Sequence, residues 1–286
     1  MKNKNLNKIL VLFLVIFSLL TSSCNESDKD YIKKEVGKVV TNEAKRIIDE
    51  ASDKISKELL DKLEELKKNV NIDSNDTINT TKSDIKDFEK LKFNNYYCKN
   101  GKSNIVLNVP NSGETLYGKL DNLGRPTYVI ANINNKMRNE AKQRGRFPIN
   151  LNPIGWYNNK EVEIKEKNGQ TYYGYFYNRS HMLADSLGGL PIEENLVTGT
   201  RTQNVGINNK GGMAYTEIKA RKYLDNNTDV ELIYQVRNVY FENELIPRYT
   251  TIDMISKDKS IDEEVIVCNS ANGYTINYNT GKYYKK

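Results

Sequence analysis

One histidine stands out in this sequence because it is the only one among 286 residues. It is His181, and it follows Asn178, Arg179 and Ser180 at the end of an aromatic, alternating run. A neutral imidazole can take a proton from water and so act as a general base. A lone polar residue at a strand end is the plainer interpretation, and the residues downstream bear on the choice.

Oxygen-bearing side chains follow the histidine. Asn195 and Asn204 bound the stretch NLVTGTRTQN, and Glu217 lies at helical spacing within residues 211–225. One histidine with amide and carboxylate oxygens is a poor set for zinc, which prefers several Cys or His ligands. These oxygens suit magnesium, which keeps several waters and takes few protein ligands. A lone histidine beside one magnesium ion is a workable arrangement for phosphodiester hydrolysis.

Three arginines are candidates for holding phosphate oxygens, with which a guanidinium pairs well. Arg201 and Arg248 are candidates for the scissile phosphate or its neighbours, although surface arginines are usually just solvated. Arg179, beside the histidine, either binds phosphate or braces the site through an ion pair. The 19 tyrosines can stack on bases, but packing in a β-rich domain explains most of them.

Strand patterns surround these residues. TLYGKL and RPTYVIANI flank the turn residues DNLG and predict a hairpin. The run 171–178 predicts a strand that ends at the NRSH motif, and residues 211–225 predict a helix. Three further strands are predicted by VELIYQVRNVYF, ELIPRYTTIDMIS and EEVIVCN. Strands, one central helical region and strands again predict an α+β fold with a mainly antiparallel sheet.

Residues 1–24 predict an export signal. MKNKNLNK is basic, ILVLFLVIFSLL is an apolar core, and TSSC places small residues before Cys24. This arrangement resembles a bacterial lipoprotein signal in which Cys24 is lipidated. The protein would then be an exported lipoprotein, facing the cell surface or the periplasm and held at the membrane by its lipid anchor. Simple secretion and an uncleaved anchor are the alternatives.

Residues 25–70 predict a helical stalk. Apolar residues recur every three to four positions from Ile32 to Val70, with no proline. Such a narrow apolar stripe needs a partner, which is either a second copy, giving self-association through this helix, or the domain itself. Residues 71–88, rich in Asn, Asp, Ser and Thr, predict a linker. The folded domain is then predicted over residues 89–286.

Charge and cysteine content bear on partners and compartment. Residues 1–88 hold 16 basic and 16 acidic residues, so the formal excess of +6 lies entirely in residues 89–286. A mildly basic domain suits a polyanionic partner. Cys98 and Cys268 in an exported domain either pair as a disulfide or remain as buried free thiols.

Several blocks, taken in order, resemble a known family. YFYNRSHMLADSLGG, NLVTGTRTQN and GGMAYTE resemble the DNA/RNA non-specific endonucleases, the ββα-metal or His-Me finger nucleases. LDNLGRPTYVIANI, NPIGWYN and VIVCNSANGYTINYNTG are similar to flanking segments of the secreted streptococcal-type deoxyribonucleases. The resemblance covers residues 110–282. The usual Asp-Arg-Gly-His motif reads Asn178-Arg179-Ser180-His181 in this chain.

The resemblance implies a ββα-metal site and a role for each residue. His181 would be the general base, and Asn204 would hold Mg²⁺, with Mn²⁺ as the alternative metal. Asn195 would orient the site, and Glu217 would hold metal-bound water. The implied activity is cleavage of DNA, with RNA as an alternative substrate, to 5′-phosphate and 3′-hydroxyl ends.

Three other functions compete with a resident nuclease. A catalytically inactive nucleic-acid-binding surface lipoprotein would keep the fold, but the intact His181, Asn204 and Glu217 favour an enzyme. A surface adhesin explains the stalk and leaves the order of the C-terminal blocks unexplained. A toxin delivered to competitors would have the same catalytic domain.

Overall fold

The computed structural model describes residues 26–73 and 91–286, with side chains from residue 45 on. The chain divides into two compact units, Met1–Leu59 and Leu60–Lys286. Within the described part, no helix is both long and apolar enough to span a membrane. The predicted export signal and Cys24 lie outside the described residues.

A single helix, α2 (Glu26–Lys68), confirms the predicted long N-terminal helix. Its apolar positions differ in exposure along its length. Ile48 and Ile55 are 66% and 59% exposed, whereas Leu63 is buried. The last turns of the helix therefore contribute to the core of the second unit, within which Leu63 lies.

The second unit is built on a seven-stranded sheet. Its strand order is β1-β3-β4-β9-β10-β11-β2, and only the β1–β3 pair is parallel. The strands are β1 Asn71–Asp73, β2 Tyr97–Lys99, β3 Thr115–Gly118, β4 Tyr128–Asn134, β9 Glu231–Val239, β10 Tyr249–Ser256 and β11 Asp262–Cys268. The predicted α+β class with a mainly antiparallel sheet is confirmed, as are the hairpin around DNLG and the last three long strands.

The sheet begins earlier in the chain than predicted. Residues 71–73, predicted as the start of a linker, form the edge strand β1 and pair with residues 116–118 of β3. The polar composition of this stretch was misleading, because an edge strand needs few apolar residues. Tyr128 of β4 also donates a hydrogen bond to Asp73, at 2.7 Å. The remainder of the predicted linker that lies in 74–88 is outside the described residues.

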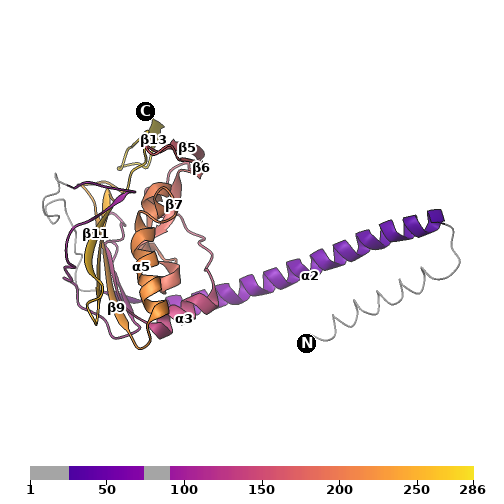
Figure 1. Cartoon of the computed structure of the whole chain (residues 1–286), viewed down its shortest axis with the longest axis horizontal. Coiled ribbons are helices and arrows are strands. Elements are labelled where there is room, and N and C mark those ends of the chain that lie inside the picture. Colours follow the sequence, from indigo (N-terminus) through magenta and orange to yellow (C-terminus); the bar gives the residue numbers. More distant parts are fainter. Residues whose placement is uncertain (1–25, 74–90) are drawn as a thin grey trace. The chain divides into compact units, whose positions relative to one another are not determined.

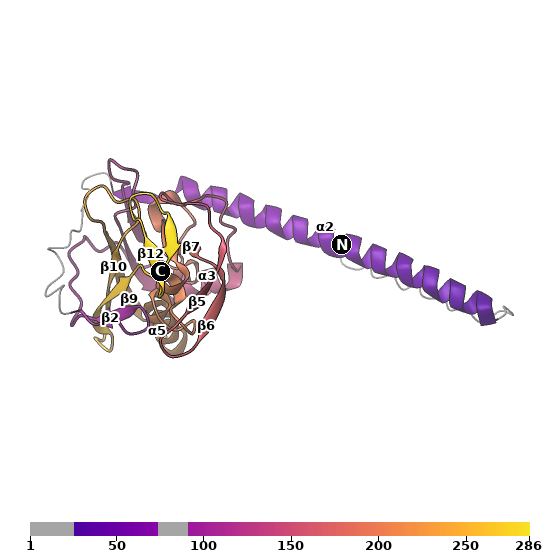
Figure 2. The ribbon, with the colours of Figure 1, turned by 90° about the horizontal axis from the view of Figure 1, so that it is seen from above.

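Helices cover one face of the sheet. α3 (Asn135–Arg144) and α5 (Met213–Asn226) lie on this face (Figure 1), and the view from above shows the same layering (Figure 2). Strand β9 alternates accordingly, since Leu232, Tyr234 and Val236 join the large core beneath the helices. α5 confirms the predicted helix. α3 was not predicted, because only Arg138 and Ala141 of its ten residues are buried.

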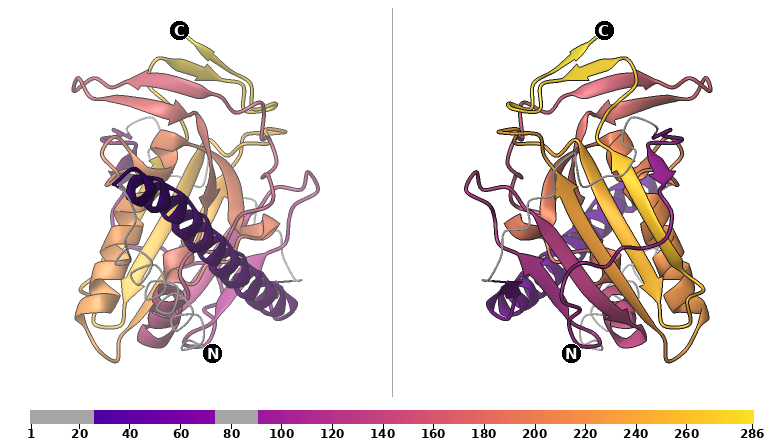
Figure 3. Two further views of the ribbon diagram at one scale, coloured as in Figure 1. Left: turned by 90° about the vertical axis from the view of Figure 1, so that its right-hand side faces the viewer. Right: turned by 90° about the vertical axis from the view of Figure 1, so that its left-hand side faces the viewer.

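A chain segment covers the other face. The backbone N–H groups of Val106 and Leu107 donate to Gln235 of β9, both at 3.0 Å, and that of Asn104 donates to Asp253 of β10 at 2.7 Å. The right-hand view of Figure 3 looks onto this face. These bonds pair polar side chains that the sheet would otherwise bury without partners.

Two small hairpins lie beyond one end of the sheet (Figures 1 and 3), and residues of both hairpins contribute to a second hydrophobic core. The hairpins are β5–β6 and β12–β13, with strands β5 Glu161–Lys165, β6 Thr171–Tyr175, β12 Tyr274–Ile276 and β13 Tyr283–Lys285. Phe176 stacks on Tyr283 with ring centroids 3.9 Å apart. Phe176 separates β6 from a new strand, β7 (Tyr177–His181), so the single strand predicted over 171–178 is two.

Both cysteines of the domain are buried free thiols, so the disulfide alternative is not realised. Cys98 lies opposite Ile266 in the β2–β11 pair, which makes it a diagonal neighbour of Cys268. Diagonal neighbours are about 7–8 Å apart, beyond the usual Cα separation of a disulfide, about 4.4–6.8 Å. Burial raises the pKa of Cys98 to about 11 and that of Cys268 to about 12.

Candidate active site

Two strands and a short helix bring the motif residues together. β7 pairs in antiparallel fashion with β8 (Leu196–Thr200), and α4 (Arg201–Val205) follows β8 directly. The Thr200 hydroxyl caps α4 by accepting from the N–H of Gln203 at 3.0 Å. This ββα arrangement places Asn204 of α4 beside β7, where the Ser180 hydroxyl donates to Asn204 Oδ1 at 3.0 Å.

A cavity of about 420 Å³ opens at this junction. It is lined by His181, Asn204, Glu217 and Arg179, which the sequence singled out, and by Arg146, which it did not. Four predicted site residues that are up to 38 positions apart therefore line one space. The cavity combines an imidazole, an amide, a carboxylate and two guanidinium groups.

His181 is the most shielded of these groups. It is 8% exposed, and its Nε2 is buried without a hydrogen-bond partner in the described part of the chain. Burial, together with the positive charges of Arg146 and Arg144, lowers the pKa of His181 to about 3. The imidazole is therefore neutral at physiological pH, as a general base must be before it accepts a proton.

Glu217 is an acidic group in a confined place. Its side chain is 16% exposed, and one carboxylate oxygen lies 3.6 Å from Arg221. Burial raises the pKa of Glu217, and the charges of Arg221 and Arg146 act in the opposite direction. Arg221 also donates to Ser186 Oγ at 3.0 Å. This second bond ties the helix that carries Glu217 to the loop that follows His181.

The guanidinium of Arg179 contacts an amide and an aromatic ring and is not neutralised by a carboxylate in the described residues. Its Nε and Nη2 donate to Asn152 Oδ1 at 3.1 and 2.8 Å, and its guanidinium lies 4.9 Å from the ring centre of Trp156. No carboxylate pairs with it among residues 45–73 and 91–286, so the ion-pair brace is not observed. Arg179, Arg146 and Asn204 also line a second cavity of about 610 Å³, which makes the two cavities neighbours.

Arg201 does not line either of these cavities. Its guanidinium lies 5.0 Å from the ring centre of Tyr172, and its Nη2 donates to Asn209 at 2.5 Å. The backbone N–H of Arg201 donates to the carbonyl of Phe176. The side chain is thus engaged on the hairpin side of β8, away from the groups that meet at His181.

Arg248 is also outside the cavity, and its charge is neutralised. It forms a bidentate ion pair with Glu244 and lies between the rings of Phe241 and Tyr278, at 5.0 and 4.3 Å. These contacts explain why it is a poor candidate for the scissile phosphate. They also raise the pKa of Arg248, mainly through the hydrogen bond to Glu244.

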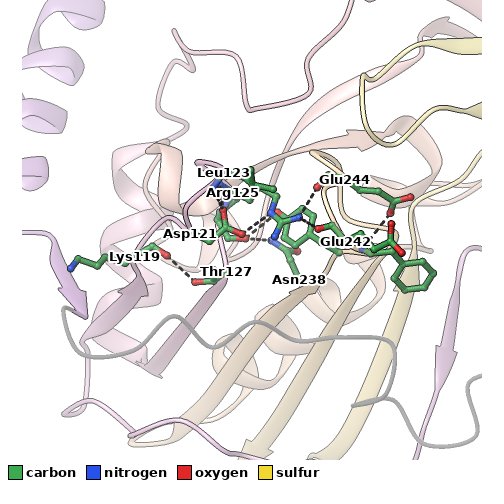
Figure 4. A network of polar contacts seen from close by, with 11 residues as sticks. Lys119, Asp121, Leu123, Arg125, Thr127, Asn238, Glu242 and Glu244 are labelled. Carbon is green, nitrogen blue, oxygen red and sulfur yellow. Dashed lines mark hydrogen bonds and ion pairs between the residues drawn. The ribbon is translucent and has the colours of Figure 1, made fainter.

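A polar network fixes the turn that carries Glu244 (Figure 4). Arg125 pairs with Asp121 at 2.6 Å, and its Nη1 donates to the carbonyl oxygens of Glu242 and Glu244 at 2.9 and 2.8 Å. The Arg125 side chain is 9% exposed. Arg248 therefore belongs to a structural cluster in which neighbouring charges are matched.

Asn195 supports the loop after His181 from within the protein. Its side chain is fully buried, accepts from Leu183 N at 2.8 Å, and donates to the carbonyls of Leu183 and Leu190 at 3.0 and 2.9 Å. Its own carbonyl accepts from Met182 N. Asn195 does not line the cavity, so it can act on the site only by orienting the loop that follows His181.

Two residues near the site were missed by sequence reasoning. Arg146 follows the unpredicted helix α3, is exposed, and has no hydrogen-bond or ion-pair partner in the part of the chain that is described. Asn95 has φ 53° and ties down the loop between α4 and α5. Its Oδ1 accepts from Ile207 N at 2.6 Å, and its carbonyl accepts from Gly212 N at 3.0 Å. The sequence around Arg146 and Asn95 does not reveal these positions, because each depends on residues more than 30 positions away in the chain.

The donor groups decide which metal the cavity fits. No cluster of three or more His, Cys, Asp or Glu side chains suited to a metal ion occurs among the described residues. An amide oxygen with a nearby carboxylate fits a hard cation that keeps most of its waters, such as Mg²⁺. Asn204 and Glu217 are the side chains of the cavity whose oxygens could hold such an ion.

Comparison with known proteins agrees with this architecture. A model of the DNA/RNA non-specific endonuclease family matches residues 89–284. The chain therefore belongs to the DNA/RNA non-specific endonuclease family. A deoxyribonuclease from Streptococcus dysgalactiae subsp. equisimilis is 32% identical over 196 residues, which cover 59% of this chain and 60% of that protein. The match thus spans less than two thirds of that relative's length.

Solved structures share the fold. The structure of Sda1 nuclease with a bound zinc ion is 31% identical, with a TM-score of 0.62, and the match covers 67% of this chain and 97% of that one. NucA from Streptococcus agalactiae with a magnesium ion bound has a TM-score of 0.53 at 21% identity, covering 68% and 89%. The second likeness concerns the fold alone.

Proposed function

We propose that this protein is a metal-dependent endonuclease that hydrolyses phosphodiester bonds of DNA without sequence specificity, with RNA as an alternative substrate. The observation that carries the proposal is the meeting of His181, Asn204 and Glu217 in one cavity, beside two arginines that have no acidic partner among the described residues. Family membership supports the reaction class. The zinc ion of the Sda1 nuclease supports a divalent metal, and the donor groups here favour Mg²⁺, with Mn²⁺ as the alternative.

Each group in the cavity has a defined role in this proposal. His181 takes the proton of the attacking water at Nδ1, because Nε2 is buried. Arg179 and Arg146 bind phosphate oxygens and orient the scissile bond. Asn204 would hold Mg²⁺, and Glu217 would orient water around it. A bound Mg²⁺ supplies positive charge against the charge that develops on the phosphate and the leaving oxygen. The bond from phosphorus to the 3′ oxygen then breaks, and the 3′ oxygen takes a proton from a solvent water, which gives 5′-phosphate and 3′-hydroxyl ends.

The proposal extends to the location and assembly of the protein. Export and lipidation at Cys24 follow from the N-terminal signal pattern, with secretion without a lipid as the alternative. The exposed Ile48 and Ile55 of α2 support self-association through this helix, which would cover them with a second copy. A tethered, exported nuclease would act on nucleic acid outside the cell and spare the cell's own genome.

The test is nicking of supercoiled plasmid by the purified protein, with Mg²⁺, with EDTA, and with His181→Ala. We expect metal-dependent nicking and linearisation in the wild type and a loss of about 10²–10⁴-fold in the variant. Thermal unfolding of both proteins is the control for folding. A wild type that binds DNA at low salt without cutting it would support the inactive nucleic-acid-binding lipoprotein instead.

A further inference from the structure

The amide of Asn204 is held by one neighbour. Among the described residues, its only side-chain hydrogen bond is the one it accepts from Ser180 Oγ, at 3.0 Å. Ser180 is fully buried, and in the same part of the chain its hydroxyl has no other partner. The two side chains therefore depend on each other for their orientation.

The surrounding backbone makes room for this contact. Ser180 lies in β7, one residue before His181, and Asn204 lies in α4, a helix of five residues. Gly199 of β8 packs against Ser180 and α4, and a Cβ there would come within 2.7 Å of Ser180 Cβ and 2.2 Å of Gln203 Oε1. A glycine at 199 thus allows the strand of the histidine and the helix of the asparagine to be joined by side chains.

We propose that Ser180 is a positioning residue that fixes which end of the Asn204 amide faces the cation, and so sets the affinity for metal. The inference rests on the proposed function, in which Asn204 holds the metal. The two ends of an amide have nearly the same shape, but only the oxygen can coordinate a cation, since the nitrogen carries two donors. The Ser180 hydroxyl fixes the oxygen and uses one of its two lone pairs, which leaves the other for the metal.

A purely structural role of Ser180 would have different consequences. If Ser180 only satisfied packing, its removal would lower stability and leave metal affinity unchanged. An aspartate at 204 separates the two cases, because its two oxygens are equivalent and neither orientation presents a donor. The need for Ser180 should therefore disappear in an Asn204→Asp background.

The experiment measures Mn²⁺ binding to the purified protein without nucleic acid, by the loss of the free-ion electron paramagnetic resonance signal. The proteins are the wild type, Ser180→Ala, Asn204→Ala, Asn204→Asp and the Ser180→Ala/Asn204→Asp double variant. We expect Ser180→Ala to weaken binding about 10-fold in the wild-type background and less than about twofold in the aspartate background. Ser180→Cys keeps the volume but is a weak donor, so it should also weaken binding and carries the test if the alanine variant unfolds.

The outcomes distinguish the inference from the proposal beneath it. Equal binding by the wild type and both Ser180 variants, with loss in Asn204→Ala, would overturn the role of Ser180 and leave the metal assignment intact. A similar loss on removing Ser180 in both backgrounds would also overturn it, because packing would then be the cause. Unchanged binding in Asn204→Ala would instead refute the metal assignment itself.

Discussion

Lowering the pH should destabilise this protein through its single histidine. Burial and two arginines lower the pKa of His181 from 6.5 to about 3 in the folded state. As the pH falls below 6.5, the unfolded chain therefore takes up a proton that the folded protein refuses. The stability associated with neutral His181 is present above pH 6.5 and is lost progressively as the pH falls toward 3. At pH 4.5, two units below the unfolded pKa, the loss is about 2.7 kcal/mol.

The assay compares the wild type with His181→Ala in urea denaturation at pH 7.5 and at pH 4.5. Carboxylates titrate in both proteins, so the difference between their pH-induced losses isolates the histidine. We expect the wild type to lose about 2.7 kcal/mol more than the variant. Because the chain has one histidine, its single imidazole NMR signal should also remain that of the neutral ring down to pH 4.5.

Two results would refute this reasoning. One is an equal loss of stability in the two proteins, and the other is an imidazole signal that titrates with a midpoint near 6.5. Either would mean that the cavity leaves His181 as well solvated as in the unfolded chain. The base would then be partly protonated near neutral pH, and nicking would fall off below pH 6.5.

Three further predictions follow from particular contacts. Arg146→Ala should raise the pKa of His181, measured on the same NMR signal, and should raise KM for DNA, while the exposed Arg46→Ala serves as the charge-matched control. Asn95→Gly keeps the left-handed backbone and removes the hydrogen bonds of the side chain to the α4–α5 loop, so it should reduce nicking and cost about 1–3 kcal/mol in urea denaturation; an unchanged rate would show that the loop holds itself. Cys98 and Cys268, buried and with raised pKa values, should resist alkylation in the native protein, and rapid modification counted by mass spectrometry would contradict their burial.

Local pattern was enough to predict most of the sheet. β9, β10 and β11 carry long runs of β-branched and aromatic residues, and α5 has clear helical spacing, so each was found from its own sequence. α3 was missed because it is polar nearly all round and is held by long-range bonds, such as that of Arg138 to the carbonyl of Ser186 at 3.0 Å. β1 was missed because it is a short, polar strand that is defined by its pairing with β3, about 45 residues further along the chain.

The site divides in the same way. His181, Asn204 and Glu217 were predicted from their residue types and from the resemblance to a known family, and the fold brings them to one cavity. The two arginines that the structure places outside the cavity could not be assigned from sequence. Arg248 is paired with Glu244, which the network of Arg125 orients, and nothing local to Arg248 reveals that pairing.

In the proposed mechanism, the electrostatics of the cavity would connect substrate binding to the strength of His181 as a base. In the free protein the charges of Arg146 and Arg144 help to keep His181 neutral, but a base with so low a pKa is a weak proton acceptor. Arg144 is already paired with Asp185 at 2.8 Å, whereas Arg146 has no acidic partner in the described residues. A phosphate bound at Arg146 would offset that charge and bring its own negative charge close to the imidazole, and both effects raise the pKa of His181. Arg146 would thus keep His181 deprotonated in the substrate-free protein. Once a phosphodiester is bound at Arg146, His181 would become a stronger base.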